Sequence, residues 1–484
     1  MEKVKRYIQN LFSAKNIVVA NNRQSLFEEF AETTECIEAV NTIIETQNLI
    51  MDKWKLKNRI ADIIAQQIVI PNATMDKQYE AKIDFEKLNL NDLIFEQFDG
   101  LEELGLSFNK ETDSIEGIPT QSGDVKIKLS FRIIGETETT PPNEKYISLV
   151  VNPDPKSLWK DIPSDKENIF WKKDDVSVAD KLGEKNIVVS SRRGRSHKNI
   201  GSFRDDDFAY KHFEETGWSV VAVSDGAGSY SLSRKGSQLA CNSVVEYFTS
   251  NNDLEKSKEF ETKISEYNSS KDENILKELE VLSKQNLYKA VAFVHTKIKE
   301  HSEETFKTNP ELFNNPKAKF PIDYYHSTLI FSLFKKYDFG YVVLTFGVGD
   351  CPIALMNEEQ TETTLLNWLD VGEFGGGTRF VTQADIFHSK EHPMATRFNM
   401  KIVPDFSYLF LMTDGIYDAK FVVEANLEKH EKWVAFLEDL KGNNEDNCKV
   451  DFDKNNEEIA NQLSNWMDFW SAGNHDDRTL AIIY

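Results

Sequence analysis

The chain is poor in cysteine and lacks long apolar runs. Its 484 residues include 4 cysteines, which form no C-x-x-C pair and no regular spacing. This excludes a disulfide framework and a cysteine-based zinc site, and it suits a reducing compartment. No stretch approaches the roughly 20 apolar residues of a membrane span, and the segment Met1 to Asn22 lacks the uninterrupted apolar core of a signal peptide. We therefore expect a cytoplasmic protein without a membrane partner.

Positive charge is also scarce. Lys and Arg total 57 against 80 Asp and Glu, which gives a net charge of -23 at pH 7 and a pI of about 4.9. A chain with this balance repels a nucleic-acid backbone, so we expect no nucleic-acid partner. At roughly 150 residues per domain, the length predicts two to four domains.

The first domain is predicted to be helical. Apolar residues recur at spacings of three and four between Ser25 and about Val69, which is typical of amphipathic helices. Pro71 marks the end of this region, because proline disfavours helix at the residue before it. We assign residues 1–72 to a helical N-terminal region. No residue in it carries chemistry, which favours packing or docking.

Residues 76–153 show the alternation of β-strands, for example in Val125–Ile133 and Tyr146–Val151. The segment Gly105–Asp124 contains G-L-S-F-N, I-E-G-I-P-T and S-G-D. It resembles the signature of small immunoglobulin-like or cadherin-like sandwich domains of bacteria. The resemblance implies an all-β sandwich with a protein-binding surface. Residues 154–180, rich in Pro, Lys and Asp, are predicted to be a linker.

Four short acidic segments lie beside apolar runs in residues 181–484. They are Arg204–Asp207, Ser224–Gly226, Thr413–Gly415 and His475–Asp477. The neighbouring runs, Trp218–Val223, Tyr408–Met412 and Leu480–Ile483, have the pattern of buried strands. One Asp-Gly pair after such a run is usually only a turn. Several carboxylates at the ends of buried strands repel one another unless a cation lies among them, and Mg²⁺ and Mn²⁺ prefer oxygen ligands. The pattern predicts a divalent metal site.

The rest of this region mixes strands and helices. Asn186–Ser190, Ser327–Leu333 and Tyr341–Val348 are further predicted strands, and Leu232–Ser250 and Leu276–Lys299 are predicted helices. This order favours an α+β domain over a doubly wound sheet. The glycine-rich run Gly372–Thr378 is predicted to form turns, because no G-K-[ST] or strand-to-helix context accompanies it.

Taken in order, these segments resemble the metal-dependent serine/threonine protein phosphatases of type 2C, the PPM family, in its bacterial branch. Arg204–Phe208 resembles the family's N/Q-E/Q-D-A-F, Val223–Gly228 its V-A-D-G-M-G-G, Gly347–Cys351 its V-G-D-S, Leu411–Asp418 its L-x-S-D-G-L-x-D, and Asp476–Thr479 its D-N-x-T. The resemblance implies an α+β fold for 181–484, with two antiparallel sheets in a β-sandwich flanked by helices.

The resemblance also implies a site. Asp225 would bridge two Mg²⁺ or Mn²⁺ ions, the Gly226 carbonyl would bind one of them, and Asp414 and Asp476 would bind the other. Asp206 would act directly or through a bound water, and Asp350 matches a position associated with a third ion. Asp225, Asp414 and Asp206 are thus the candidate catalytic residues. The implied reaction is hydrolysis of phosphoserine or phosphothreonine by an activated water. The implied partners are a phosphoprotein and a cognate kinase or its targets.

Two positions depart from the family pattern. Many members carry an arginine shortly before the first acidic motif, where this chain has Ile200–Ser202. Candidates to bind the phosphate instead are Arg195, His197, Lys198 and Arg204, although each could equally belong to a solvated basic loop. Ala227 stands where animal members have a histidine, so water or another side chain would protonate the leaving group. The missing arginine supports an alternative, a catalytically weak pseudophosphatase acting as a binding or scaffold protein.

Overall fold

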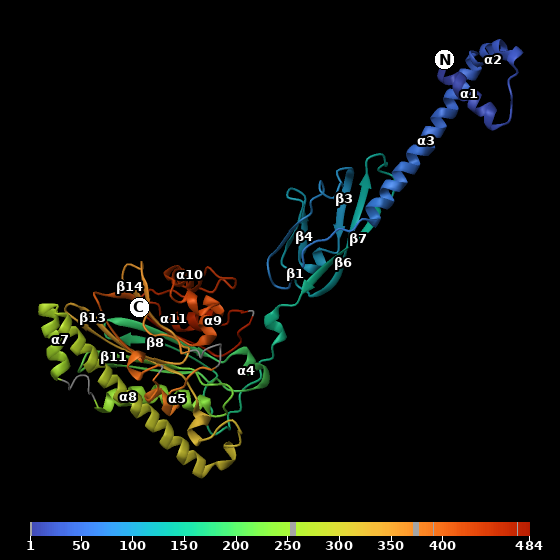
Figure 1. Cartoon of the computed structure of the whole chain (residues 1–484). Helices are drawn as coiled ribbons and strands as arrows, with labels where there is room; N and C mark the ends of the chain where they lie inside the picture. Colours follow the sequence, from blue (N-terminus) through green and yellow to red (C-terminus); the bar gives the residue numbers. More distant parts are fainter. Residues whose placement is uncertain (1, 252–257, 371–376, 391, 472) are drawn as a thin grey trace. The chain divides into compact units, whose positions relative to one another are not determined.

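We describe the chain from a computed structural model. The structure describes residues 2–251, 258–370, 377–390, 392–471 and 473–484, so most of the glycine-rich run at 372–378 lies outside the described residues. The chain forms two compact units, residues 1–158 and 159–484 (Figure 1). Among the described residues, no helix is both long enough and apolar enough to cross a membrane.

The first unit begins with three helices, as predicted. These are α1 (Glu2–Ala14), α2 (Gln24–Ala31) and α3 (Thr34–Ala65). Thr33 starts α3, because its hydroxyl accepts a hydrogen bond from the Cys36 N–H that the first helical turn leaves without a partner. Ile8, Phe27 and Val40 form a small buried cluster among the three helices.

Seven strands follow in two sheets. One sheet has the order β1-β7-β6-β3 and the other β2-β5-β4. The strands are β1 (Ala73–Thr74), β2 (Tyr79–Lys82), β3 (Leu93–Asp99), β4 (Leu106–Asn109), β5 (Ser114–Gly117), β6 (Gly123–Ile133) and β7 (Asn143–Asn152). The end of α3 belongs to the same core through Ile63, and the Lys145 ammonium donates to the Ile64 carbonyl at 2.9 Å. The helical region and the β region therefore form one unit rather than the two domains expected.

Two antiparallel sheets form the centre of the second unit, which confirms the predicted fold. The five-stranded sheet has the order β10-β11-β12-β13-β16 and the six-stranded sheet β15-β14-β17-β18-β9-β8. The strands are β8 (Asp175–Leu182), β9 (Lys185–Arg192), β10 (Asp207–Phe213), β11 (Trp218–Ser224), β12 (Leu329–Tyr337), β13 (Gly340–Val348), β14 (Ile353–Asn357), β15 (Thr363–Leu365), β16 (Phe398–Val403), β17 (Phe406–Met412) and β18 (Arg478–Ile483).

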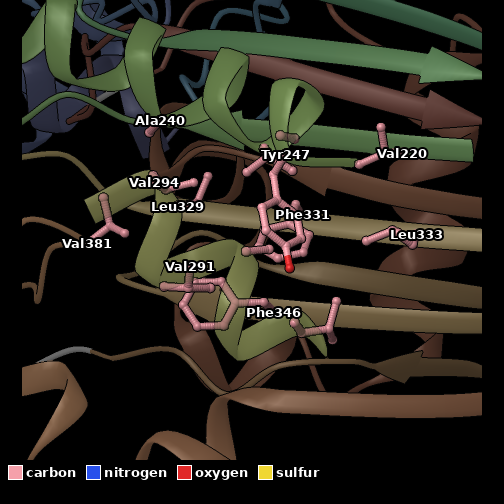
Figure 2. Close-up of a cluster of buried hydrophobic side chains, with 14 of the residues drawn as sticks. Val220, Ala240, Tyr247, Val291, Val294, Leu329, Phe331, Leu333, Phe346 and Val381 are labelled. Atoms are coloured by element: carbon pink, nitrogen blue, oxygen red, sulfur yellow. The ribbon is translucent and has the colours of Figure 1, made fainter. Parts of the chain in front are cut away.

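Helices cover the outer face of each sheet, so the central strands are buried on both faces. In β11, Val221 and Val223 face the second sheet, while Val220 and Ala222 face the helices. Figure 2 shows Tyr247 of α5 (Ser233–Asn251) and Val291 of α8 (Glu273–Thr308) packed on Phe331 and Phe346 of the first sheet. The other helices on this side and on the second sheet are α7 (Lys258–Ser270), α9 (Asp414–Phe421), α10 (His430–Leu440) and α11 (Ile459–Trp466).

The predicted linker at 154–180 is wrong for most of its length. From Trp159 onward the chain belongs to the second unit, and β8 already begins at Asp175. The Trp159 ring lies 4.6 Å from the His475 ring, and Lys172 is buried. The composition is that of a linker, but the polar side chains find partners inside the fold.

Candidate metal centre

The sheet pairing brings the acidic segments to one end of the sandwich. Asp207 at the start of β10 pairs with Ser224 at the end of β11, and Met412 at the end of β17 pairs with Leu480 of β18. In antiparallel sheets the end of one strand lies beside the start of its neighbour. Segments that are distant in sequence therefore meet at a single edge.

Asp206 is the most deeply buried carboxylate of the centre. Its Oδ2 accepts hydrogen bonds from the hydroxyls of Thr413 and Thr479, both at 2.8 Å, while its Oδ1 is buried without a partner. Burial and then repulsion from Asp477 raise the pKa of Asp206 to about 7. The two threonines orient this carboxylate, and sequence reasoning did not identify them.

Asp225 lies directly after β11, and Thr328 fixes its backbone. The Asp225 N–H donates to the Thr328 hydroxyl at 2.9 Å, and its carbonyl accepts from the Thr328 N–H at 2.8 Å. Burial, followed by the charges of Asp414 and Asp206, raises the pKa of Asp225 well above its usual value. Next in sequence, Gly226 has room for no side chain, because a Cβ there would lie 2.7 Å from the Asp205 carbonyl oxygen.

Asp350 and Asp414 complete the inner cluster. The Asp350 Oδ2 accepts from the Thr378 hydroxyl at 2.6 Å, whereas its Oδ1 and the Asp414 Oδ1 are buried without partners. Burial, with repulsion from Asp350 and then Asp476, raises the pKa of Asp414. Ligand atoms of Asp225, Asp350 and Cys351 lie within 4.8 Å of one another. Burial raises the pKa of the Cys351 thiol, which disfavours a thiolate there and favours the carboxylate oxygens as ligands.

These residues fit a divalent cation. In the part of the chain that the structure describes, Asp206, Asp225, Asp350, Asp414 and Asp476 make no ion pair with Lys, Arg or His. A buried carboxylate oxygen without a donor loses its hydration and gains nothing in return. An oxygen-only set of several negative charges is the environment that Mg²⁺ and Mn²⁺ prefer.

A comparison with protein families decides the assignment. The sequence profile described as "Protein phosphatase 2C" matches residues 193–467, which is more than half of the chain. The chain belongs to the protein phosphatase 2C family. The predicted family is thus confirmed. A comparison with curated proteins finds no match.

Solved structures similar to the chain include three phosphatases. A bacterial serine phosphatase is 14% identical with a TM-score of 0.35, and the alignment covers 61% of this chain and 96% of that one. The catalytic domain of the serine/threonine phosphatase PstP, in complex with 2 manganese ions, is 14% identical with the same coverage and a TM-score of 0.34. Stp1 from Staphylococcus aureus is 13% identical, with 65% and 98% covered and a TM-score of 0.33. The family assignment rests on the profile match alone.

Two of the four candidate phosphate ligands are engaged elsewhere. The Arg195 guanidinium donates to the Asp468 carbonyl at 2.8 Å and to its carboxylate at 2.9 Å. The buried Arg204 guanidinium donates to the Ser191 hydroxyl at 2.6 Å and to the Asp206 carbonyl at 2.5 Å. Both arginines hold the chain in place, so the expectation that they bind phosphate is not supported. The Lys198 ammonium has no hydrogen-bond partner among the described residues.

His197 is the candidate that lies at the centre. Its Nδ1 is 3.0 Å from the Asp477 carboxylate, its Nε2 is 3.9 Å from the Asp205 carboxylate, and Asp476 is close by. Burial alone would lower the pKa of His197, but the hydrogen bond and charge of Asp477, with the charge of Asp205, raise it to about 10. In the metal-free protein these carboxylates therefore favour the imidazolium form of His197.

Asp477 joins the segments behind the metal centre. Besides His197, it accepts hydrogen bonds from the N–H groups of Gly194 and Asp205. From the sequence, Asp477 had no role of its own, whereas its side chain is buried, with 2% exposed. The signal that could have identified it is its position in the D-N-x-T segment, directly after a predicted metal ligand.

Lys172 is a second residue that sequence reasoning missed. Its buried ammonium donates to the Asp206 carbonyl at 2.6 Å, the Asp207 carboxylate at 3.0 Å, the Arg234 carbonyl at 3.2 Å and the Ser237 hydroxyl at 3.4 Å. Lys172 thus ties the segment before β8 to the strand that presents Asp206. Nothing in its local sequence distinguishes it from the lysines of a linker.

The metal-free protein is expected to lose stability as the pH rises from 5 to 7. Asp205 and Asp206 have folded pKa values of about 7, above their usual value of 3.8. In this window the folded state binds more protons than the unfolded state, so the free energy of unfolding falls with rising pH. Thermal unfolding in a chelator should show the melting temperature falling across this window, and Mn²⁺ should remove most of the fall. A melting temperature in chelator that is flat or rising would contradict the prediction.

Proposed function

We propose that this protein is a metal-dependent phosphoprotein phosphatase that hydrolyses phosphoserine and phosphothreonine. The observation that carries the proposal is the set of buried oxygens without donors on Asp206, Asp350 and Asp414. Asp225, Asp414, Asp476 and the Gly226 carbonyl would hold two Mg²⁺ or Mn²⁺ ions, with Asp206 acting directly or through water. Asp350 would serve a third ion.

Two bound cations at such a centre lower the pKa of a water and stabilise the charge that builds up during attack on phosphorus. The protein's own residues prepare the site for this chemistry. Thr413 and Thr479 hold the Asp206 carboxylate, and Thr328 holds the backbone of Asp225. These contacts fix the carboxylates before substrate arrives, which reduces the reorganisation that the reaction requires.

We further propose that His197 supplies the positive charge that the family's arginine usually provides. Asp477 holds the imidazole through Nδ1, so Nε2–H remains to donate to a phosphate oxygen. An imidazolium makes a single charge-assisted hydrogen bond where a guanidinium makes a bidentate pair, so phosphate is held less tightly.

Release of phosphate from a phosphoserine peptide tests both proposals. The full-length protein is expected to release phosphate with Mn²⁺ and to stop when a chelator is added. His197→Ala is expected to lower kcat/KM by about tenfold to a hundredfold, mainly through KM, because one charged hydrogen bond to phosphate is lost. Lys198→Ala, the adjacent control, should change it much less. Bound Mn²⁺ without phosphate release would favour the pseudophosphatase alternative.

For the first unit we propose docking of a partner or substrate. The middle of α3, residues 45–55, is exposed at every position. It includes Ile50 at 64% and Trp54 at 68% exposure, four residues apart on one face of the helix, and such a grouped apolar surface is typical of a contact site. The strand order, with β1 parallel to β7, is compatible with the immunoglobulin-like sandwich predicted from the sequence. In the same assay, the double substitution Ile50→Glu and Trp54→Glu should slow hydrolysis of the native phosphoprotein but not of a short phosphopeptide. A double variant that hydrolyses both substrates at the wild-type rate would refute docking.

A further inference from the structure

A cavity of about 740 Å³ lies in the second unit. Its walls come from the C-terminal half of α8, from η5 (Pro321–Tyr325) and η7 (Ala384–Phe387), and from Tyr230. Ligand pockets in proteins commonly measure about 300–1,000 Å³. The cavity is therefore large enough to accommodate several side chains of a bound peptide.

Two sets of contacts link the cavity wall to segments that carry metal-site carboxylates. The Ala227 N–H, two residues after Asp225, donates to the His326 carbonyl at 3.0 Å, and the Tyr230 ring lies 4.7 Å from the His326 ring. In the second set, the Thr378 hydroxyl donates to Asp350. Four residues further along the chain, the Thr382 hydroxyl lies 2.7 Å from the His326 Nδ1. The segments that carry the metal-site carboxylates thus also build this cavity.

The cavity wall carries three lysines whose ammonium groups have no partner among the described residues. They are Lys299, Lys317 and Lys319. The wall also has three acidic residues, Glu303, Asp323 and Asp385. Asp323 accepts from the N–H groups of Lys319 and Phe320 at 2.8 and 3.0 Å, and Asp385 pairs with Arg379 at 2.7 Å. Because Arg379 neutralises Asp385, three lysines face the carboxylates of Glu303 and Asp323. In a chain with a net charge of -23, this local excess of positive charge favours an anionic ligand.

We propose that this cavity is a substrate subsite that recognises acidic side chains flanking the phosphoserine or phosphothreonine. The inference rests on the phosphatase function proposed above and specifies its substrate class. The lysines would pair with Asp or Glu of the bound peptide, and Phe320, Pro321 and Ile322 would contact the apolar parts of its side chains. Three solvent-exposed ion pairs, each worth about twofold to fivefold, give a preference of about tenfold or more.

Two phosphopeptides that differ only in their flanking residues test the proposal. One carries Asp residues on both sides of the phosphoserine, and the other carries Asn at the same positions. The wild-type protein is expected to prefer the Asp peptide about tenfold in kcat/KM, mainly through KM, and the preference should weaken as salt is added. The substitutions Lys299→Gln, Lys317→Gln and Lys319→Gln together should abolish the preference.

A matched triple variant and a small substrate complete the design. Lys307→Gln, Lys432→Gln and Lys454→Gln remove the same charge from exposed lysines outside the cavity and should keep the preference. Both triple variants should hydrolyse p-nitrophenyl phosphate, which has no flanking residues, at the wild-type rate. Fluorescence anisotropy measures the affinity of the metal-free protein for the Asp peptide directly. Only the cavity variant should bind this peptide more weakly than the wild type.

The possible failures are distinguishable. If the wild type hydrolyses neither p-nitrophenyl phosphate nor either peptide, the proposed phosphatase function has failed. If it hydrolyses all three but does not prefer the Asp peptide, or if the cavity variant keeps the preference, the subsite proposal is overturned and the phosphatase function stands.

Discussion

Asp414→Asn is expected to reduce phosphate hydrolysis by about 10³-fold or more, while raising the melting temperature of the metal-free protein. Asparagine has the size of aspartate but carries no charge, so it weakens metal binding. Without metal, burial and then repulsion from Asp350 and Asp476 disfavour the Asp414 carboxylate, which is why its pKa is raised. Removing that repulsion should stabilise the metal-free state by about 1 kcal/mol, or roughly 2 °C.

Opposite effects on activity and stability separate this explanation from simple misfolding. Asp338→Asn is the matched control, because Asp338 is exposed at the β12–β13 turn, at the far end of β12 from the centre. It should change neither activity nor the melting temperature in chelator. If Asp414→Asn keeps most of its activity, or if it destabilises the metal-free protein, Asp414 does not belong to a cluster of repelling metal ligands.

Lys172→Met is expected to lower the free energy of unfolding of the second unit by about 3–5 kcal/mol, because removing one partner of a buried charged network leaves the others unsatisfied. The carbonyls of Asp206 and Arg234 and the carboxylate of Asp207 would lose their shared donor. Methionine fills a similar volume, so the loss would come from hydrogen bonds and charge. Urea unfolding in chelator measures it.

Lys173→Met provides the control for this substitution. Lys173 is the adjacent residue and is exposed, so its replacement should change stability by no more than about 0.5 kcal/mol. Equal unfolding midpoints for the two variants would show that the Lys172 network contributes nothing to the stability of the fold.

The elements with a repeating local pattern were predictable. The spacing of Phe27, Ile37 and Val40 indicated the helices of the first unit, and the fully apolar runs at 218–223 and 408–412 indicated strands buried on both faces. The boundaries were not predictable, because they depend on tertiary contacts. Residues 154–180 have the composition of a linker, yet Lys172 finds carbonyl groups more than thirty positions along the chain.

The candidate site also has a part that the sequence predicts and a part that it does not. The carboxylates were predictable because each follows or precedes an apolar strand, and antiparallel pairing brings such ends together. Whether a basic side chain is available to a substrate is a different question, since it depends on which groups already engage that side chain. Arg195 and Arg204 looked equivalent to His197 in sequence, but backbone carbonyls engage both arginines. Asp477 shows the converse, a buried connecting residue that resembles a turn residue in sequence.

Titration of the metal-free protein with Mn²⁺ tests the central claim most directly, namely that the carboxylate cluster is a two-metal centre. Isothermal calorimetry on the full-length chain at pH 7.5 should show two Mn²⁺ ions bound per chain, and Asp225→Asn, which removes the proposed bridging carboxylate, should abolish or strongly weaken that binding. The Asp338→Asn control should bind as the wild type does. An absence of saturable Mn²⁺ binding, or binding that Asp225→Asn leaves unchanged, would contradict the account.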